Sequence, residues 1–377
     1  MKRIFSYYSF FTVNKFIHPY LQGKNMCDYN KKTLKSSCDS VKLGKTDLTA
    51  NKNGFGALPI QRISPLESLN LLHKAFDNGI NFYDTARYYT DSEIKLGAAF
   101  GKGSGKNRAD IIIASKTGAA TRDDFWRDLH TTLENLQTEY LDIYQFHNPP
   151  QCPKPGDASG LYEAMQQAKT QGKIRFIGLT NHRLPVAVEA VKSELYATLQ
   201  FPFSYLSTPE EVDLTRLCQE KSVGFIAMKA LAGGLINDAR LAYAFMAEFD
   251  NVLPIWGIQR ERELDEFIAC QAEKIQLSNE MRTRIKDDRK ILSGEFCRGC
   301  GYCLPCPAGI DIPTCARMSL LLRRAPQKDF LAIGGQKKMA KISECKHCGH
   351  CAKKCPYHLN TPELLQKNYE DYLTFLK

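Results

Sequence analysis

The sequence predicts an α/β protein in which a closed (β/α)8 barrel, the TIM-barrel fold, precedes a small α-helical domain. Three observations lead to this prediction. The chain has 377 residues, which is enough for a barrel of roughly 250 residues and a smaller second domain. Short apolar runs alternate with amphipathic segments between Gly54 and Ala272. Nine of the 14 cysteines follow Glu295, which marks a tail of different character.

Composition narrows the class of protein. Hydrophobic residues make up 43% and charged residues 24% of the chain. These ordinary proportions disfavour disorder, collagen-like repeats and a polytopic membrane protein. Because no run of 18 apolar residues occurs, we expect no membrane span. The net charge of +10 comes without a nucleic-acid-binding motif, so we expect no nucleic-acid partner.

Residues 1–40 are expected to be a disordered N-terminal extension. The first 27 residues contain no Asp or Glu. The apolar run from Ile4 to Val13 is interrupted by Ser and Thr residues, which does not suit a secretory signal peptide. A transit peptide remains an alternative, as does an upstream start with Met26 as the true beginning.

Eight candidate strands lie within residues 41–275, and amphipathic helical patterns separate them. Strict alternation of strand and helix favours a parallel sheet, and eight units in about 220 residues favour closure into a barrel. In one helical pattern, Ser64 is a candidate N-cap before Pro65. The candidate strands are Gly54–Leu58, Ile80–Asp84, Asp110–Ser115, Tyr140–His147, Ile174–Leu179, Ala197–Phe201, Gly224–Met228 and Val252–Gly257.

Titratable residues follow three neighbouring strands. The second strand ends in Asp84, with Tyr89 five residues later, the third in Lys116 and the fourth in His147. A single Asp or His at such a position is commonly a cap or a surface residue. A barrel, however, places its active site at the C-terminal ends of its strands. The coincidence of a carboxylate, a phenol, an ammonium group and an imidazole on adjacent strand ends therefore predicts an active site.

Several motifs surround these strand ends. They are Leu43–Thr46 with Gly54–Gly56, the D-T-A-x-x-Y-x-x-S-E run of Asp84–Glu93, the Gly-Leu-Thr-Asn of Gly178–Asn181, and the Pro-Ile-Gln-Arg of Pro59–Arg62. Together they resemble the aldo/keto reductase superfamily over roughly Val41 to Glu266. The last motif is similar to a prokaryotic branch with a ferredoxin-like tail. The resemblance implies a catalytic tetrad of Asp84, Tyr89, Lys116 and His147.

The chemistry of these residue types suits carbonyl reduction, which needs a hydride at carbon and a proton at oxygen. We expect Tyr89 to donate the proton and the Lys116 cation to lower the pKa of its phenol. Asp84 would hold Lys116 as an ion pair, and His147 would orient the carbonyl. Tyr88 is the rival phenol, and the spacing favours Tyr89.

The hydride source follows from the resemblance. No dinucleotide-binding fingerprint follows Gly54–Gly56, and Gly101–Lys106 fails the spacing of a phosphate-binding loop. The resemblance instead implies NADPH, or NADH, laid across the barrel mouth. Phe267 stands where a polar contact to adenine is expected. The implied cofactor residues are Thr180, Asn181 and Gln200 near the nicotinamide amide, Met228 and Lys229 at the stacking position and its neighbour, and Arg260 and Arg262 at the 2′-phosphate.

The tail contains two cysteine runs. The first is Cys297, Cys300, Cys303 and Cys306, and the second is Cys345, Cys348, Cys351 and Cys355, each followed by Pro. The second has the C-x2-C-x2-C-x3-C-P spacing of bacterial ferredoxins, so two runs predict two 4Fe-4S clusters. Zinc is the alternative, although zinc sites usually use two separated C-x2-C pairs. We therefore expect a helical linker over residues 276–296 and a two-cluster ferredoxin-like domain over residues 297–377.

The pairing of cysteines with clusters stays open. In two-cluster ferredoxins the fourth cysteine of each run binds the other cluster, which would exchange Cys306 and Cys355. The first run is one residue short before its Cys-Pro, and Cys315 is a spare candidate ligand.

The sequence favours an oxidoreductase that reduces an aldehyde or ketone with NAD(P)H, with clusters for electron transfer or structure. The alternative is an electron-transfer or sensor protein whose barrel is a non-catalytic scaffold. Basic residues of the tail, such as Lys353 and Lys354, could dock an acidic electron carrier, a ferredoxin or flavodoxin. Because such clusters need reduced cysteines, we expect a cytoplasmic protein.

Overall fold

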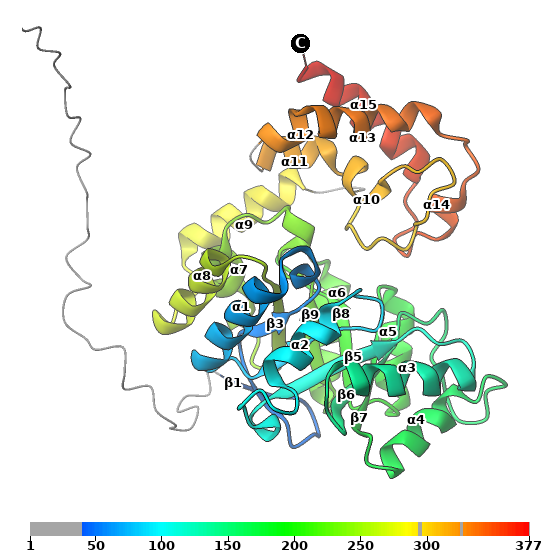
Figure 1. Cartoon of the computed structure of the whole chain (residues 1–377). Helices are drawn as coiled ribbons and strands as arrows, with labels where there is room; N and C mark the ends of the chain where they lie inside the picture. Colours follow the sequence, from blue (N-terminus) through cyan, green and yellow to red (C-terminus); the bar gives the residue numbers. More distant parts are fainter. Residues whose placement is uncertain (1–39, 293–295, 325–326, 377) are drawn as a thin grey trace, which may run out of the picture. The chain divides into compact units, whose positions relative to one another are not determined.

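The computed structural model describes residues 40–292, 296–324 and 327–376, which belong to one compact unit. The predicted N-terminal extension, apart from Ser40, lies outside the described residues. Eight parallel strands form a closed barrel in the order β10-β3-β4-β5-β6-β7-β8-β9. Figure 1 shows strands of the barrel with helices around them. This confirms the predicted barrel. The strands are β3 Gly54–Gly56, β4 Phe82–Asp84, β5 Ile112–Thr117, β6 Leu141–His147, β7 Ile174–Thr180, β8 Thr198–Pro202, β9 Gly224–Met228 and β10 Val252–Gly257.

Helices surround the barrel, and their starts follow from local sequence. At the first helix, Ser64 accepts a hydrogen bond from the Glu67 amide while the Glu67 side chain accepts one from the Ser64 amide. This capping box satisfies two amides that a helix start leaves unpaired. The helices are α1 Pro65–Asp77, α2 Ser92–Phe100, α3 Arg122–Asn135, α4 Leu161–Thr170, α5 Leu184–Ser193, α6 Pro209–Glu220, α7 Ala239–Ala247, α8 Glu261–Ala272 and α9 Asn279–Ile291.

A hairpin that the sequence did not predict closes the N-terminal end of the barrel. Strands β1 Ser40–Lys42 and β2 Thr49–Asn51 pair antiparallel. Their apolar side chains, including Val41 and Leu43, pack with the residues inside the barrel. Gly44 has φ 55°, and a Cβ there would lie 2.3 Å from the Ser222 oxygen. Only glycine lets the turn approach the barrel this closely.

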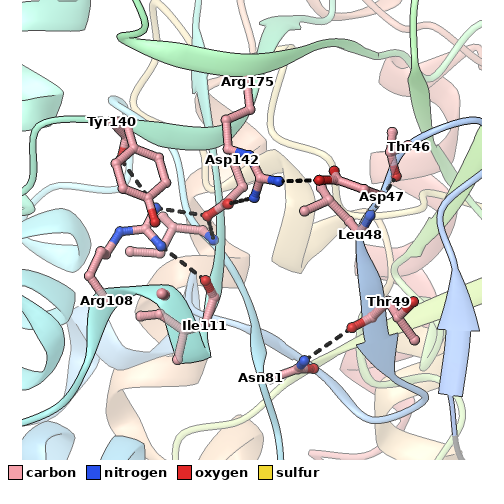
Figure 2. A network of polar contacts seen from close by, with 12 residues as sticks. Thr46, Asp47, Leu48, Thr49, Asn81, Arg108, Ile111, Tyr140, Asp142 and Arg175 are labelled. Carbon is pink, nitrogen blue, oxygen red and sulfur yellow. Dashed lines mark hydrogen bonds and ion pairs between the residues drawn. The ribbon is translucent and has the colours of Figure 1, made fainter.

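Charged side chains hold the same end of the barrel together. Figure 2 shows Asp142 between two arginines. Its carboxylate accepts hydrogen bonds of 2.7 Å from both Arg108 and Arg175, and Arg175 also pairs with Asp47 of the β1–β2 turn at 2.7 Å. This network ties β6, β7 and the hairpin together at the end opposite the predicted active site.

Helix α9 packs on the barrel. Ile285 of α9 joins the main hydrophobic core, and the Arg289 side chain donates to the Tyr205 carbonyl at 2.5 Å. The predicted linker region therefore contains a docked helix. None of the described helices has the length and apolar character needed to cross a bilayer.

The tail is small and helical, as predicted. Its core combines cysteines of both runs with a few apolar side chains, such as Ile312, Met339 and Tyr372. A core this thin needs further crosslinking to be stable, which metal clusters supply. The tail helices are α10 Ile312–Cys315, α11 Met318–Arg324, α12 Lys328–Leu331, α13 Ile333–Ala340, α14 His350–Lys353 and α15 Thr361–Thr374.

Candidate active site and cysteine pockets

A buried ion pair lies at the C-terminal end of the barrel. The Lys116 Nζ on β5 lies 2.7 Å from each carboxylate oxygen of Asp84, which ends β4, and 2.7 Å from the Thr85 carbonyl. Neither side chain is more than 3% exposed. Burial lowers the pKa of Lys116 and raises the pKa of Asp84, while their mutual attraction opposes both shifts.

Tyr89 and His147 complete the predicted tetrad. The Lys116 Nζ lies 5.2 Å from the centroid of the Tyr89 ring. The rings of Tyr89 and His147 meet edge to face with centroids 6.1 Å apart. The structure therefore brings Asp84, Tyr89, Lys116 and His147 together at one rim of the barrel.

The electrostatics of Tyr89 differ from the expectation of a lowered pKa. Burial, together with the charge of Asp84, raises the pKa of the Tyr89 phenol well above its usual value. Burial is the main cause because it disfavours the charged phenolate, and the negative charge of Asp84 beside Lys116 adds to the shift. Tyr89 consequently keeps its proton at neutral pH, which is the state a proton donor needs.

The rival phenol lies on the outside of the same rim. Tyr88 is 63% exposed, and its ring stacks on His147 with centroids 6.0 Å apart. It packs over Gly118, where a Cβ would meet the ring at 2.2 Å. Both phenols are near His147, but Tyr89 is the one beside Lys116.

His147 is held in its neutral form. Burial lowers the pKa of its imidazole to about 3, and the Lys116 charge adds to the shift. Its buried Nδ1 has no hydrogen-bond partner among the described residues. A neutral imidazole can donate one hydrogen bond and accept another, so His147 can donate to a carbonyl oxygen without being protonated.

Glu93 anchors the loop that carries Tyr89, a role the sequence motif did not reveal. Its carboxylate accepts hydrogen bonds of 2.8 Å from both Ser115 and Thr132, although the residue is only 1% exposed. It also pairs with Arg87. The start of α2 is thereby fixed to β5 and α3, which sets the position of the loop before it.

Gln200 reaches the ion pair from β8. Its Nε2 donates to the Asp84 carboxylate at 3.3 Å, and its Oε1 accepts from Gln145 at 2.8 Å. Gln145 keeps a buried Oε1 with no partner among the described residues. In this structure Gln200 thus supports the tetrad directly.

Thr180 ends β7 and Asn181 follows it. The Asn181 side chain donates to the Pro149 carbonyl at 2.8 Å and accepts from the Arg183 amide at 2.8 Å. The Thr180 hydroxyl contacts only the Met228 sulfur, at 3.7 Å, among the contacts described for it. Both residues are buried, and Asn181 shapes the loop.

The remaining implied cofactor residues lie on different sides of the site. Arg260 and Arg262 are exposed at the start of α8. Phe267, in contrast, stacks on Trp256 with centroids 4.1 Å apart inside the core. Phe267 is thus a packing residue. Lys229 points into the tail, with its Nζ 3.5 Å from the Gly299 oxygen.

Five cysteines of both runs line one pocket of the tail. Four of them are Cys306, Cys345, Cys348 and Cys351, and the fifth, Cys303, also interacts with Cys297 and Cys300. Apolar side chains such as Ile310 and Leu365 complete the pocket wall. A four-iron cluster takes four thiolates in an apolar surrounding, so this donor set fits one.

The other four cysteines form a second group. Cys297 and Cys303 are buried, and Cys355 is close enough to interact electrostatically with Cys297 and Cys300. This grouping agrees with the crossed pairing of two-cluster ferredoxins. Cys315 is fully buried and donates to the Lys338 carbonyl, which leaves it outside both groups.

A single zinc ion would need closer ligands. Tetrahedral zinc with bonds of about 2.3 Å places its thiolates about 3.8 Å apart. Among the described residues, no three His, Cys, Asp or Glu side chains converge into such a group. In a four-iron cluster each thiolate binds its own iron, so the four cysteines need not converge on one metal ion.

The tail contacts the barrel beside the tetrad. His182, two residues after β7, hydrogen-bonds through Nδ1 with the Tyr357 hydroxyl at 2.7 Å, and its ring meets Tyr302 at 5.0 Å. Tyr302 lies between Cys300 and Cys303, and Tyr357 is two residues after Cys355. Arg298 in turn pairs with Glu211 of α6 at 2.8 Å. These contacts link positions 87 to 175 residues apart in the sequence, which one sequence does not reveal.

Comparison with known proteins identifies both domains. The model of the aldo/keto reductase family matches residues 52–246, which is more than half of the chain. The chain belongs to the aldo/keto reductase family. The model of the 4Fe-4S dicluster domain matches residues 296–360. The predictions of an aldo/keto reductase-type oxidoreductase with a ferredoxin-type tail are therefore confirmed.

Relatives of this aldo/keto reductase have diverse names. It is 32% identical over 212 residues to L-galactose dehydrogenase of Arabidopsis thaliana, covering 52% of this chain and 66% of that protein. It is 31% identical to methylglyoxal reductase DkgB of Salmonella typhi, covering 49% of this chain and 70% of that protein. The chain thus spans about two thirds of the length of these relatives.

Solved structures share the barrel. An aldo-keto reductase of Bacillus halodurans has a TM-score of 0.58 at 23% identity and covers 66% of this chain and 96% of its own. An aldo-keto reductase of Klebsiella pneumoniae in complex with NADPH has a TM-score of 0.57 at 23% identity, covering 66% and 94%. At these identities the likeness shows the fold.

Proposed function

We propose that this protein reduces the carbonyl group of an aldehyde or ketone with a hydride from NADPH or NADH. One observation carries the proposal: the buried Asp84–Lys116 pair lies beside Tyr89 and His147 at the C-terminal rim of the barrel. An acid, a compensated cation and a neutral hydrogen-bond donor are the groups that carbonyl reduction needs.

Each residue of the tetrad has a proposed task. His147, which is neutral, donates a hydrogen bond to the substrate oxygen and orients it. A bound reduced nicotinamide supplies the hydride, with its electron pair, to the carbonyl carbon. Tyr89 gives its hydroxyl proton to the oxygen as the C–O π bond opens. Lys116 then stabilises the phenolate that remains, and Asp84 holds Lys116 in place.

We propose that the nicotinamide binds near Thr180, with Arg260 and Arg262 available to a 2′-phosphate. The exposed arginines offer charge for that phosphate. The Klebsiella pneumoniae aldo-keto reductase, which shares the barrel fold, was solved in complex with NADPH, and this supports a nicotinamide cofactor. Met228 lies beside the Thr180 hydroxyl. Lys229, the next residue, contacts the Gly299 carbonyl of the tail.

We further propose two 4Fe-4S clusters in the tail. The first cluster is bound by Cys297, Cys300, Cys303 and Cys355. The second cluster is bound by Cys345, Cys348, Cys351 and Cys306. The cysteine-lined pocket of the tail and the match to a dicluster domain support two clusters, and the interactions of Cys355 with Cys297 and Cys300 support this division of the ligands. Since the thiolates must stay reduced, a reducing compartment such as the cytoplasm suits the protein.

An acidic one-electron carrier, a ferredoxin or flavodoxin, is the proposed partner of the tail. Lys346, Lys353 and Lys354 are exposed near cysteines of the second cluster. Positive charge at this surface would attract an acidic carrier at low ionic strength. One electron would pass from the reduced carrier to an oxidised cluster, and rates that do not change with salt would contradict electrostatic docking.

The activity test compares the two phenols at the rim. Anaerobically purified protein is assayed for NADPH oxidation with a panel of aldehydes and ketones, beside the variants Tyr89→Phe and Tyr88→Phe. We expect Tyr89→Phe to lower kcat/KM by about 10²–10⁴-fold, the usual contribution of general acid catalysis, and Tyr88→Phe to stay close to wild type. Full activity in Tyr89→Phe would reject the assignment, and a wild type without turnover would favour the non-catalytic scaffold.

A further inference from the structure

A barrel lysine enters the loop of the first cysteine run. Lys229 follows β9 and has φ 56°, a left-handed backbone conformation that is unusual for a residue with a side chain. Its Nζ lies 3.5 Å from the carbonyl oxygen of Gly299. Gly299 stands between Cys297 and Cys300. The barrel thereby places a cation among thiols proposed to bind the first cluster.

A second cation reaches the same loop from the tail. Arg317 donates to the Gly233 carbonyl of the barrel at 2.5 Å. Its guanidinium also fills the space beside Gly299, where a Cβ would lie 2.8 Å from the Arg317 Cζ. The loop needs glycine here because Gly299 also has φ 64°. Lys229 and Arg317 therefore approach the loop from both domains.

Lys229 faces the thiols of Cys300 and Cys297 and the cation of Arg317. The nearby cation Arg298 is different, because Glu211 compensates it. Lys229 thus has its electrostatic partners in the first cluster loop rather than in a carboxylate.

A half-buried cation at this position affects electron uptake. Reduction adds one negative charge to a cluster and its thiolates, and the potential depends on net charge, hydrogen bonds and solvent exposure. A cation shielded from water stabilises the added charge more than an exposed cation, because solvent does not screen it. Removing such a cation should make reduction less favourable.

We propose that Lys229, supplied by the barrel, raises the reduction potential of the first cluster, with Arg317 assisting from the tail. Lys229 is a positioning residue that acts through the cluster. This inference rests on the proposed ligands of the first cluster, and it makes that cluster the one whose redox state depends on the barrel.

The test is an anaerobic redox titration of the full chain, followed by electron paramagnetic resonance. We expect Lys229→Met to lower the equilibrium constant for reducing the first cluster at least tenfold, which corresponds to 59 mV for one electron. Lys229→Arg, which keeps the charge, should stay near wild type. Lys346→Met is the matched control. Lys346 is exposed beside Cys345, so its loss should change the reduction potential of the second cluster much less than Lys229→Met changes that of the first.

Two further variants identify the cluster and protect the test against misfolding. In Cys348→Ala only the first cluster keeps four thiolates, so a single reduction potential remains. Adding Lys229→Met to this variant should shift that potential as much as Lys229→Met shifts the first cluster in the otherwise unchanged protein. Arg317→Met should lower the same potential if Lys229→Met loses iron. An unshifted first cluster in iron-replete Lys229→Met would overturn the inference while leaving the clusters in place. A wild type without iron and acid-labile sulfide would overturn the proposed clusters as well.

Discussion

His147 shows how one buried side chain links the site to stability. Its pKa of about 3 means that the folded protein keeps the imidazole neutral where an unfolded chain, with a pKa of about 6.5, would protonate it. Below pH 6.5 the unfolded state therefore binds more protons. Stability contributed by His147 is fully present above pH 6.5 and is lost as the pH falls towards 3.

This linkage predicts a shallower acid dependence for His147→Gln. Between pH 6.5 and 5.0 the wild type should lose up to about 2 kcal/mol more unfolding free energy than the variant. Urea unfolding at several pH values measures the difference. His130→Gln, at an exposed position of α3, controls for the loss of an imidazole. Parallel curves for wild type and His147→Gln would contradict the buried neutral imidazole.

The strands show what the sequence could predict at the scale of elements. All eight predicted barrel strands overlap observed strands, because local hydrophobic periodicity indicates where strands and helices alternate. Their ends moved: β3 stops at Gly56, while β5 continues to Thr117. The β1–β2 hairpin escaped prediction because its strands have three residues each and the barrel side chains that they pack against lie far away in the chain.

In the candidate site, too, some residues could be predicted from the sequence and others could not. Spacing and family motifs predicted the tetrad, whose members each end a strand or follow one. The same motif contains Glu93, but its hydrogen bonds to Ser115 and Thr132 depend on tertiary packing. The contact of His182 with Tyr302 and Tyr357 depends on where the tail docks. Neither could be read from residue types alone.

Asp142 offers a test of the element contacts at the opposite end of the barrel. Asp142→Asn should lower the unfolding free energy by about 3–5 kcal/mol, because it leaves Arg108 and Arg175 without their shared buried carboxylate. Denaturant unfolding measures the loss. Asp213→Asn, which breaks an exposed pair with Arg216, should cost no more than about 1 kcal/mol. Equal effects would contradict the structural role of the Asp142 network.

At the scale of the whole molecule, the tetrad and the tail meet at one edge of the barrel mouth. In the proposed reaction the nicotinamide gives a hydride, which carries two electrons, whereas each proposed cluster would accept one electron. His182 interacts with His147 of the tetrad and contacts Tyr302 and Tyr357 of the tail. The proposed reaction therefore depends on which electrons reach the carbonyl carbon.

A deuterium transfer experiment answers that question most directly. Purified holoprotein is incubated anaerobically with an accepted carbonyl substrate and NADPH labelled with deuterium on the transferred face of the nicotinamide, and the alcohol is analysed by mass spectrometry. We predict that the alcohol carries one deuterium on the former carbonyl carbon. In Tyr89→Phe, product formation should be slower by about 10²–10⁴-fold. An alcohol that carries no deuterium, or that forms only when a one-electron donor is added, would contradict it.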